Sequence, residues 1–281
     1  MASDKGFWRT FGVRLLAAMF LLPLFIFSAL WGGWWFFGFS GLAIILLTRE
    51  FAQLAAARGV RGIFPELLPF QLIILLAFHR GGAERGGEMA GFLILMLLVW
   101  AALRGRIEGA WERVGTRLLA LFYLAWLPGH WILLRNLGEQ MGFPAEAAGK
   151  WLLFGAGLIW LGDTGAYLVG SLFGKHPLGT PVSPNKSVEG ALGGLATSLI
   201  AAWFLREPWM PFLSGMQALG LGLTVALAGQ VGDLFESLLK RGAGSKDSGT
   251  AIPGHGGFLD RLDSMLFGFP MLYYFLTWVI F

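Results

Sequence analysis

Apolar stretches long enough to cross a lipid bilayer recur along almost the whole chain. A membrane-spanning helix needs roughly 20 predominantly apolar residues, and about nine stretches of this kind are present. They centre on Gly12–Trp31, Trp34–Leu54, Ile63–Phe78, Met89–Leu103, Leu118–Leu134, Trp151–Phe173, Ala191–Leu205, Phe212–Leu239 and Met265–Phe281. Because the third and fourth stretches are short, the number of spans could differ from nine by about one or two. The pattern predicts an all-α integral membrane protein.

Composition favours lipid rather than water as the solvent. Of the 281 residues, 56% are hydrophobic and 14% are charged, whereas soluble domains are roughly 25% charged. The chain has no cysteine, which excludes disulfides, thiolate catalysis and cysteine-based metal sites. The first stretch follows basic residues, as in a signal peptide, but its length and the stretches after it indicate a retained helix.

Basic residues are distributed unevenly between the connecting segments. If the N-terminus is cytoplasmic, the opposite face holds only a few of the 21 Lys and Arg residues, namely Arg80, Arg85, Arg135, Lys150 and Arg206. Since cytoplasmic loops are enriched in Lys and Arg, we expect the N-terminus and the two polar loops that follow the sixth and eighth stretches to be cytoplasmic. Glycines inside the stretches, such as those in Gly190-Ala-Leu-Gly-Gly, are expected to let helices pack closely.

Three acidic residues stand out inside the apolar stretches, where ionisable side chains are costly and usually face a cavity or a partner. They are Asp163 in the sixth stretch and Asp233 and Glu236 late in the eighth. Asp233 and Glu236 are three residues apart and share one helix face. A buried ion pair with a neighbouring Lys or Arg is the structural alternative, and for Asp233 we favour a functional role.

The densest polar segment follows the eighth stretch. Its cations suit phosphate groups, and its glycines allow close backbone approach; these residues are Lys240, Arg241, Lys246, Arg261, Gly254, Gly256 and Gly257. Asp260 and Asp263 are three residues apart at the start of the last stretch. Carboxylates mixed with phosphate-binding cations are what a divalent ion bridging to a nucleotide requires. Ordinary juxtamembrane charges would explain the basic residues but not the glycines, His255 and the paired aspartates together.

A second polar segment follows the sixth stretch. Lys175 and Lys186 are phosphate-binding candidates there, and Ser183, Asn185 and Ser187 are hydrogen-bonding candidates. Taken alone, Ser183-Pro-Asn-Lys-Ser is an ordinary turn. Its interest comes from the expectation that it shares a membrane face with the segment after the eighth stretch.

Together these residues resemble the signature of the phosphatidate cytidylyltransferase (CDP-diacylglycerol synthase) family. The signature is filled without a gap by Ser237, Lys240, Arg241, Lys246, Asp247, Pro253, Gly254, His255, Gly256, Gly257, Asp260, Arg261 and Asp263. The stretches Asp163-Thr-x-Ala-Tyr and Ser183-Pro-x-Lys-Ser-x-Glu-Gly also match family patterns. The resemblance is close from Trp151 onward, whereas the N-terminal half matches in length and hydropathy.

The resemblance implies transfer of CMP from CTP to phosphatidate, giving CDP-diacylglycerol and pyrophosphate for phospholipid synthesis. The implied metal ligands are Asp233 and Asp260, with Asp263, Glu236 and Asp163 as supporting acids. The implied catalytic and phosphate-binding set is Lys240, Arg241, Lys246, Asp247, His255, Arg261 and Lys186, and the implied nucleotide-binding set is Ser183, Lys175, Gly256 and Gly257. The cofactor implied is Mg²⁺, and a monovalent ion such as K⁺ beside it is left open because the carboxylates outnumber those that one Mg²⁺ usually takes.

The resemblance also implies a setting. We expect a multi-pass protein of a bacterial cytoplasmic (inner) membrane, with a cytoplasm-facing active-site cavity and with CTP, phosphatidate and the bilayer as partners. Residues 1–150 would form an N-terminal transmembrane region of about five helices, and 151–281 a catalytic region of about four. No nucleic-acid partner is expected, and a homodimer is left open.

Two other functions compete with this interpretation. A CTP-dependent lipid-alcohol kinase shares distant motifs, but the complete signature from Ser237 to Asp263 argues against it. A transporter would use Asp163, Asp233 and Glu236 as ion-coupling carboxylates. That function leaves the basic, glycine-rich loop unexplained, and the chain shows no inverted repeat.

Overall fold

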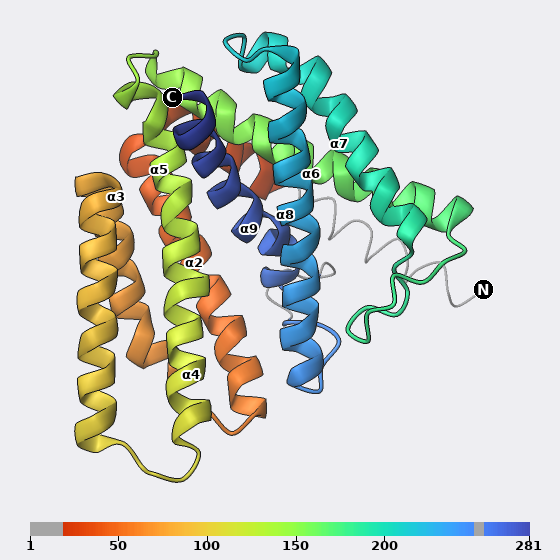
Figure 1. The fold of residues 1–281 in the computed structure, drawn as a ribbon. Helices are drawn as coiled ribbons and strands as arrows, with labels where there is room; N and C mark the ends of the chain where they lie inside the picture. The colour runs from red at the N-terminus through yellow and green to blue at the C-terminus, as the bar shows by residue number, and fades with distance from the viewer. Residues whose placement is uncertain (1–18, 250–255) are drawn as a thin grey trace.

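The computed structural model describes residues 19–249 and 256–281, and in these ranges the chain is helical, with an isolated bridge between Pro177 and Ser187 in place of a sheet. A short helix, Met19–Trp31, comes first. The elements that follow are α2 (Gly33–Ala57), α3 (Ile63–Arg104), α4 (Ala110–Leu121), the π-helix η1 (Phe122–Trp126), α5 (Leu127–Gln140), α6 (Ala145–Phe173), α7 (Val188–Trp209), α8 (Gly215–Gly242), α9 (Leu259–Phe275) and the π-helix η2 (Leu276–Ile280) (Figure 1). The predicted all-α fold is confirmed.

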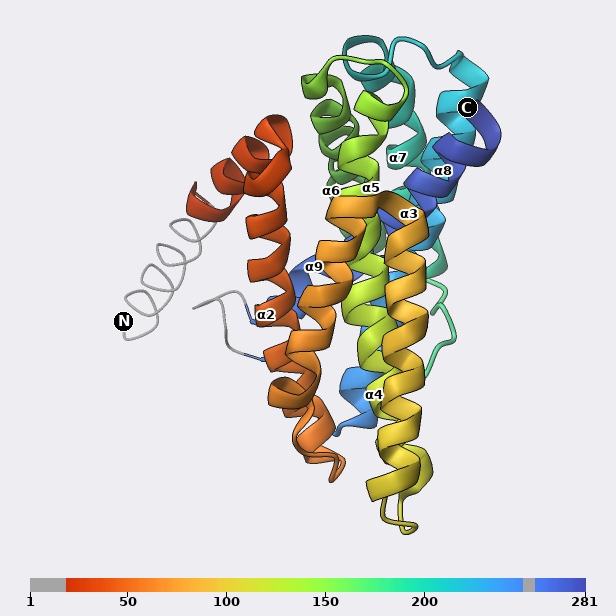
Figure 2. The ribbon, with the colours of Figure 1, turned by 90° about the vertical axis from the view of Figure 1, so that its left-hand side faces the viewer.

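Seven helices in the described ranges are long and apolar enough to cross a membrane. The sequence predicted about nine such elements, and the difference arises in two places. The helix Met19–Trp31 is short over its described part. In addition, the third and fourth predicted stretches both fall in α3, whose backbone departs from helical geometry at Gly82, with φ 66° and ψ −156°. Only glycine adopts such a conformation readily, and Figures 1 and 2 show the two arms of α3 side by side after the chain reverses there.

The described parts of both polar segments singled out in the sequence lie toward one end of the bundle (Figures 1 and 2). Residues 58–62, 105–109, 174–187 and 243–249 lie toward this end, and residues 141–144, residues 210–214 and the C-terminus lie toward the other (Figures 1 and 2). The alternation of helix directions therefore brings the connection between α6 and α7 to the same side as the segment after α8.

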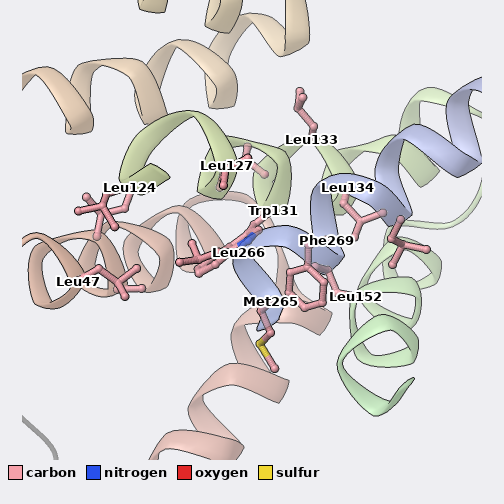
Figure 3. Packing of buried hydrophobic residues seen from close by; sticks show 14 of the residues in the cluster. Leu47, Leu124, Leu127, Trp131, Leu133, Leu134, Leu152, Met265, Leu266 and Phe269 are labelled. Atoms are coloured by element: carbon pink, nitrogen blue, oxygen red, sulfur yellow. The ribbon is translucent and has the colours of Figure 1, made fainter. Parts of the chain in front are cut away.

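A shared core connects the first helices to the last ones. Trp131 of α5 and Phe269 of α9 lie with ring centroids 6.0 Å apart, and Leu47 of α2 and Leu152 of α6 are fully buried in the same cluster (Figure 3). This cluster stabilises the bundle through the close packing of its side chains.

Glycines bring α6 and α7 into close contact, as the sequence predicted. A Cβ atom added at Gly190 would lie 3.0 Å from the carbonyl oxygen of Ala166, and one at Gly193 would lie 2.5 Å from Cβ of Val169. Neither position has room for a side chain. The two helices thus approach each other closely near the connection between them, residues 174–187.

Candidate active site

A cavity of about 600 Å³ lies between α6, α7, α8, the start of α9 and the 174–187 connection. Its charged and polar lining comprises Asp163, Tyr167, Ser171, Asn185, Lys186, Ser187, Gln230, Asp233, Lys240, Asp260, Asp263 and Ser264. The volume falls in the range of roughly 300–1,000 Å³ that is typical of small-molecule sites. Six charged residues proposed from the sequence meet in this cavity: Asp163, Lys186, Asp233, Lys240, Asp260 and Asp263.

Lys186 and Asp233 form an ion pair on the cavity wall. The ammonium Nζ of Lys186, from the connection between α6 and α7, lies 2.5 Å from Oδ2 of Asp233 on α8. Both side chains remain about one-third exposed, at 33% and 36%. The ion pair is therefore accessible from the cavity, and either partner can exchange its contact for a ligand.

Lys240 lies between two carboxylates. Its Nζ is 2.5 Å from Oε2 of Glu236, one turn earlier on α8, and 2.5 Å from Oδ1 of Asp260 at the start of α9. Glu236 is completely buried and does not line the cavity among the described residues. Lys240 therefore provides the positive charge that a buried carboxylate needs in order to be tolerated.

Asp260 is held by several donors besides Lys240. Its Oδ2 accepts hydrogen bonds from the backbone N–H of Gly257 at 2.8 Å, the hydroxyl of Ser248 at 3.0 Å and the backbone N–H of Ser248 at 3.3 Å. The sequence suggested that the N–H of Gly257 binds phosphate, whereas in this structure it orients a carboxylate. Gly256, with φ +82°, supplies a backbone conformation that favours glycine at this turn.

Other residues proposed from the sequence lie outside the cavity lining. Among the described residues these are Lys175, Ser183, Glu236, Arg241, Lys246, Asp247, Gly256, Gly257 and Arg261. Arg241 instead connects the two polar segments, since its Nε donates to the carbonyl oxygen of Val182 at 3.5 Å and its Nη1 to that of Ser245 at 3.4 Å. His255, with Pro253 and Gly254, lies outside the described residues.

Two residues that sequence reasoning missed lie against the site. Glu50 of α2 is buried and contacts the start of α9, and Ser248 contacts both Glu50 and Asp260. The signal for Glu50 was present, because it is an acid inside the apolar stretch Trp34–Leu54. No local sequence pattern indicates that this stretch packs close to the last helix.

The carboxylate oxygens that line the cavity are donors of the type that a magnesium ion binds. Among the described residues, no three Asp, Glu or His side chains lie close enough together to hold a metal by themselves. Mg²⁺ usually takes one or two protein carboxylates and completes its shell with water and substrate phosphates. Asp163, Asp233, Asp260 and Asp263 supply hard oxygen donors around one cavity, which meets that requirement.

These features define an all-helical protein with seven candidate membrane spans in its described residues and a charged cavity that suits phosphate chemistry. The family follows from comparison with known proteins: a model described as the cytidylyltransferase family matches residues 12–279. This chain belongs to the cytidylyltransferase family. The match includes the N-terminal half, which the motifs alone did not reach, and it confirms the resemblance found in the sequence.

Several similar proteins align with this chain over most of their length. A phosphatidate cytidylyltransferase of Synechocystis sp. is 33% identical over 292 aligned residues, covering 94% of this chain and 96% of the relative. A phosphatidate cytidylyltransferase of Bacillus subtilis is 35% identical and covers 83% of each chain, and one of Staphylococcus aureus is 31% identical and covers 92% of this chain and 96% of its own.

Proposed function

We propose that this protein transfers CMP from CTP to phosphatidate, producing CDP-diacylglycerol and pyrophosphate. The observation that carries the proposal is the meeting of Lys186, Lys240 and the aspartates in one cavity, in a chain of the cytidylyltransferase family. A kinase that acts on a lipid alcohol would need a base beside a hydroxyl. A phosphatidate phosphate is already anionic and needs no strong base.

The main barrier for such a reaction is repulsion between two anions. An oxygen of the phosphatidate phosphate attacks the α-phosphorus of CTP, the bond from that phosphorus to the bridging oxygen breaks, and pyrophosphate leaves with the electron pair. Lys186 and Lys240 are suited to binding phosphate oxygens and aligning the two groups in line, which lowers the barrier through positioning and electrostatics. The ion pairs that they form in this structure hold them at the cavity.

We assign the metal site to Asp233 and Asp260, with Asp163, Asp263 and Glu236 in support. Mg²⁺, when bound there, supplies positive charge to the phosphate oxygens. A monovalent ion such as K⁺ beside the Mg²⁺ belongs to the same proposal, because the carboxylates outnumber those that one Mg²⁺ usually takes. We assign Arg241, Lys246 and Arg261, which are exposed, to binding the triphosphate as it arrives from solution, together with Asp247 and His255.

The membrane setting is also a proposal. In this arrangement the helix Met19–Trp31, the two arms of α3 and the remaining long helices all lie in the bilayer of a bacterial cytoplasmic membrane. The N-terminus and the cavity face the cytoplasm, and 151–281 carries most of the catalytic residues. The distribution of Lys and Arg and the common side of residues 174–187 and 243–249 (Figure 1) support this orientation.

The test is a direct assay of the purified protein in detergent. We expect CDP-diacylglycerol and pyrophosphate to form from CTP and phosphatidate with Mg²⁺, and the activity to disappear when EDTA removes the metal. Asp233→Asn and Asp260→Asn should each lower kcat by about 10²–10³-fold, because each removes charge stabilisation from the transition state.

Circular dichroism of each variant shows whether the helices are intact. Absence of CDP-diacylglycerol under varied lipid and metal conditions would contradict the proposal. Formation of CDP and a phosphorylated lipid alcohol would indicate the kinase instead. Ion uptake into vesicles without CTP consumption would indicate the transporter.

A further inference from the structure

Glu50 of α2 accepts hydrogen bonds from the start of α9. Its side chain is buried, with 2% of the residue exposed. Its Oε1 accepts a hydrogen bond from the N–H of Phe258 at 2.8 Å, and its Oε2 accepts one from the N–H of Leu259 at 2.8 Å. The first N–H groups of a helix lack partners within the helix and favour negative charge. The N-cap residue of α9, Phe258, makes no side-chain capping hydrogen bond, and among the described residues the carboxylate of Glu50, from a distant helix, accepts these N–H groups.

Ser248 connects Glu50 to the cavity. Its hydroxyl oxygen lies 3.2 Å from Oε2 of Glu50 and 3.0 Å from Oδ2 of Asp260. A serine hydroxyl has one hydrogen, so it can donate to only one of these carboxylates at a time. The backbone N–H of Ser248 and that of Gly257 donate to Asp260 in addition. Glu50, Ser248 and Asp260 therefore form a continuous polar chain from α2 to the cavity wall.

Two glycines make room for this chain. A Cβ atom added at Gly249 would lie 2.8 Å from Oε1 of Glu50, and one added at Gly257 would lie 2.8 Å from Oε2 of Glu50 and from Oδ2 of Asp260. Gly257 also lacks space beside the hydroxyl of Ser248. The segment that bears Asp260 thus packs directly against the carboxylate of Glu50.

We propose that Glu50 is a positioning residue of the active site. By fixing the first turn of α9 and, through Ser248, the carboxylate of Asp260, it sets the orientation in which Asp260 meets Mg²⁺ and substrate. This inference rests on the proposed function. It extends the site to the N-terminal helices, because Glu50 precedes Asp260 by about 200 residues and reaches it through contacts between helices.

The test compares the full-length wild-type protein with Glu50→Gln, Ser248→Ala and a control, Glu66→Gln. Glu66 is also an acid of the N-terminal helices, but it accepts hydrogen bonds from Arg117 rather than from α9. For each protein, kcat and the KM for CTP are measured, Mg²⁺ binding without substrates is measured by calorimetry, and Tm reports the fold.

We expect Glu50→Gln and Ser248→Ala to lower kcat and Mg²⁺ affinity by about 10- to 100-fold, the usual effect of removing a group that orients a metal ligand. Glu66→Gln should leave both values unchanged. A role limited to folding would lower Tm and leave kcat per folded molecule and Mg²⁺ affinity at their wild-type values, and that result from a folded Glu50→Gln protein would overturn the inference.

If Glu50→Gln fails to fold, the Ser248→Ala variant tests the inference, because it leaves both N–H contacts of Glu50 in place. Wild-type kcat and Mg²⁺ affinity in Ser248→Ala would overturn the inference, and a loss of tenfold or more would support it. If the wild-type protein makes no CDP-diacylglycerol, the proposed function fails on its own. The Mg²⁺ titrations then still test the connection between Glu50 and Asp260.

Discussion

The first helices and the last helices of this protein contain the same types of charged side chain but use them differently. In the first helices, Arg117 of α4 donates to Oε2 of Glu66 through Nε at 2.8 Å and Nη2 at 2.6 Å, and it also donates to the carbonyl oxygens of Arg113 and Arg61. Its donors are directed at protein acceptors. In the last helices, Lys186 and Asp233 form a pair that stays about one-third exposed on a cavity.

Two neutral polar side chains of the first helices, Thr48 and Gln71, are also paired with each other. Thr48 of α2 donates to Oε1 of Gln71 at 2.6 Å, and Nε2 of Gln71 donates to the carbonyl oxygen of Ala120 at 3.1 Å. This relay connects α2, α3 and α4 inside the core. The comparison shows that a charged pair left accessible on a cavity is available to a ligand, whereas polar groups whose hydrogen bonds are completed by protein connect helices to one another.

The largest effect is expected from Lys240, which belongs to both the cavity and the buried network. Lys240→Met would leave the buried Glu236, and Asp260 beside it, without their shared cation. Leaving a buried charge uncompensated costs about 3–5 kcal/mol, so we expect a lower Tm together with loss of activity. The matched variant Lys186→Met removes a partly exposed pair and should lower kcat with little change in Tm. Equal Tm losses in the two variants would contradict the distinction.

The charged cavity could largely be predicted from the sequence, whereas its support could not. Asp163, Asp233 and Asp260 belong to contiguous motifs, and a charge in an apolar stretch is visible without a structure. Glu50 is likewise a charge in an apolar stretch and can be seen in the sequence. Its function, however, depends on α2 packing against the start of α9, and no local pattern specifies that contact. The direction of the N–H of Gly257, toward Asp260 rather than toward solvent, likewise depends on how the turn folds.

Gly82 shows the corresponding limit for the fold. The sequence predicted separate helices over Ile63–Phe78 and Met89–Leu103, and both stretches are helical in α3. What hydropathy could not specify is that the reversal between them takes place at one glycine with a non-helical backbone, with helix continuing on either side.

An intermediate effect is expected where the polar groups are already paired. Arg117→Gln would remove the guanidinium from Glu66 and from two carbonyl oxygens. Glu66 is 37% exposed, so solvent would compensate part of the loss, and we expect a destabilisation of about 1–3 kcal/mol. Thermal unfolding in detergent measures it. The kcat of the folded fraction should remain that of the wild type, and a change in the KM for CTP would show that the paired network also serves the cavity.

The smallest effects are expected from two glycines that differ in how closely other helices pack against them. Gly193→Ala would place a methyl group 2.5 Å from Cβ of Val169 on α6, and overpacking of this kind costs about 1–3 kcal/mol. Gly91→Ala, in the second arm of α3, would bring the added group within 4 Å of no atom of the described residues beyond its neighbours on the same helix. It should be neutral or stabilising by up to about 1 kcal/mol, because alanine restricts the unfolded chain. Tm values of the two variants test this difference. A destabilised Gly91→Ala protein would indicate that the second arm of α3 packs against a surface outside this chain.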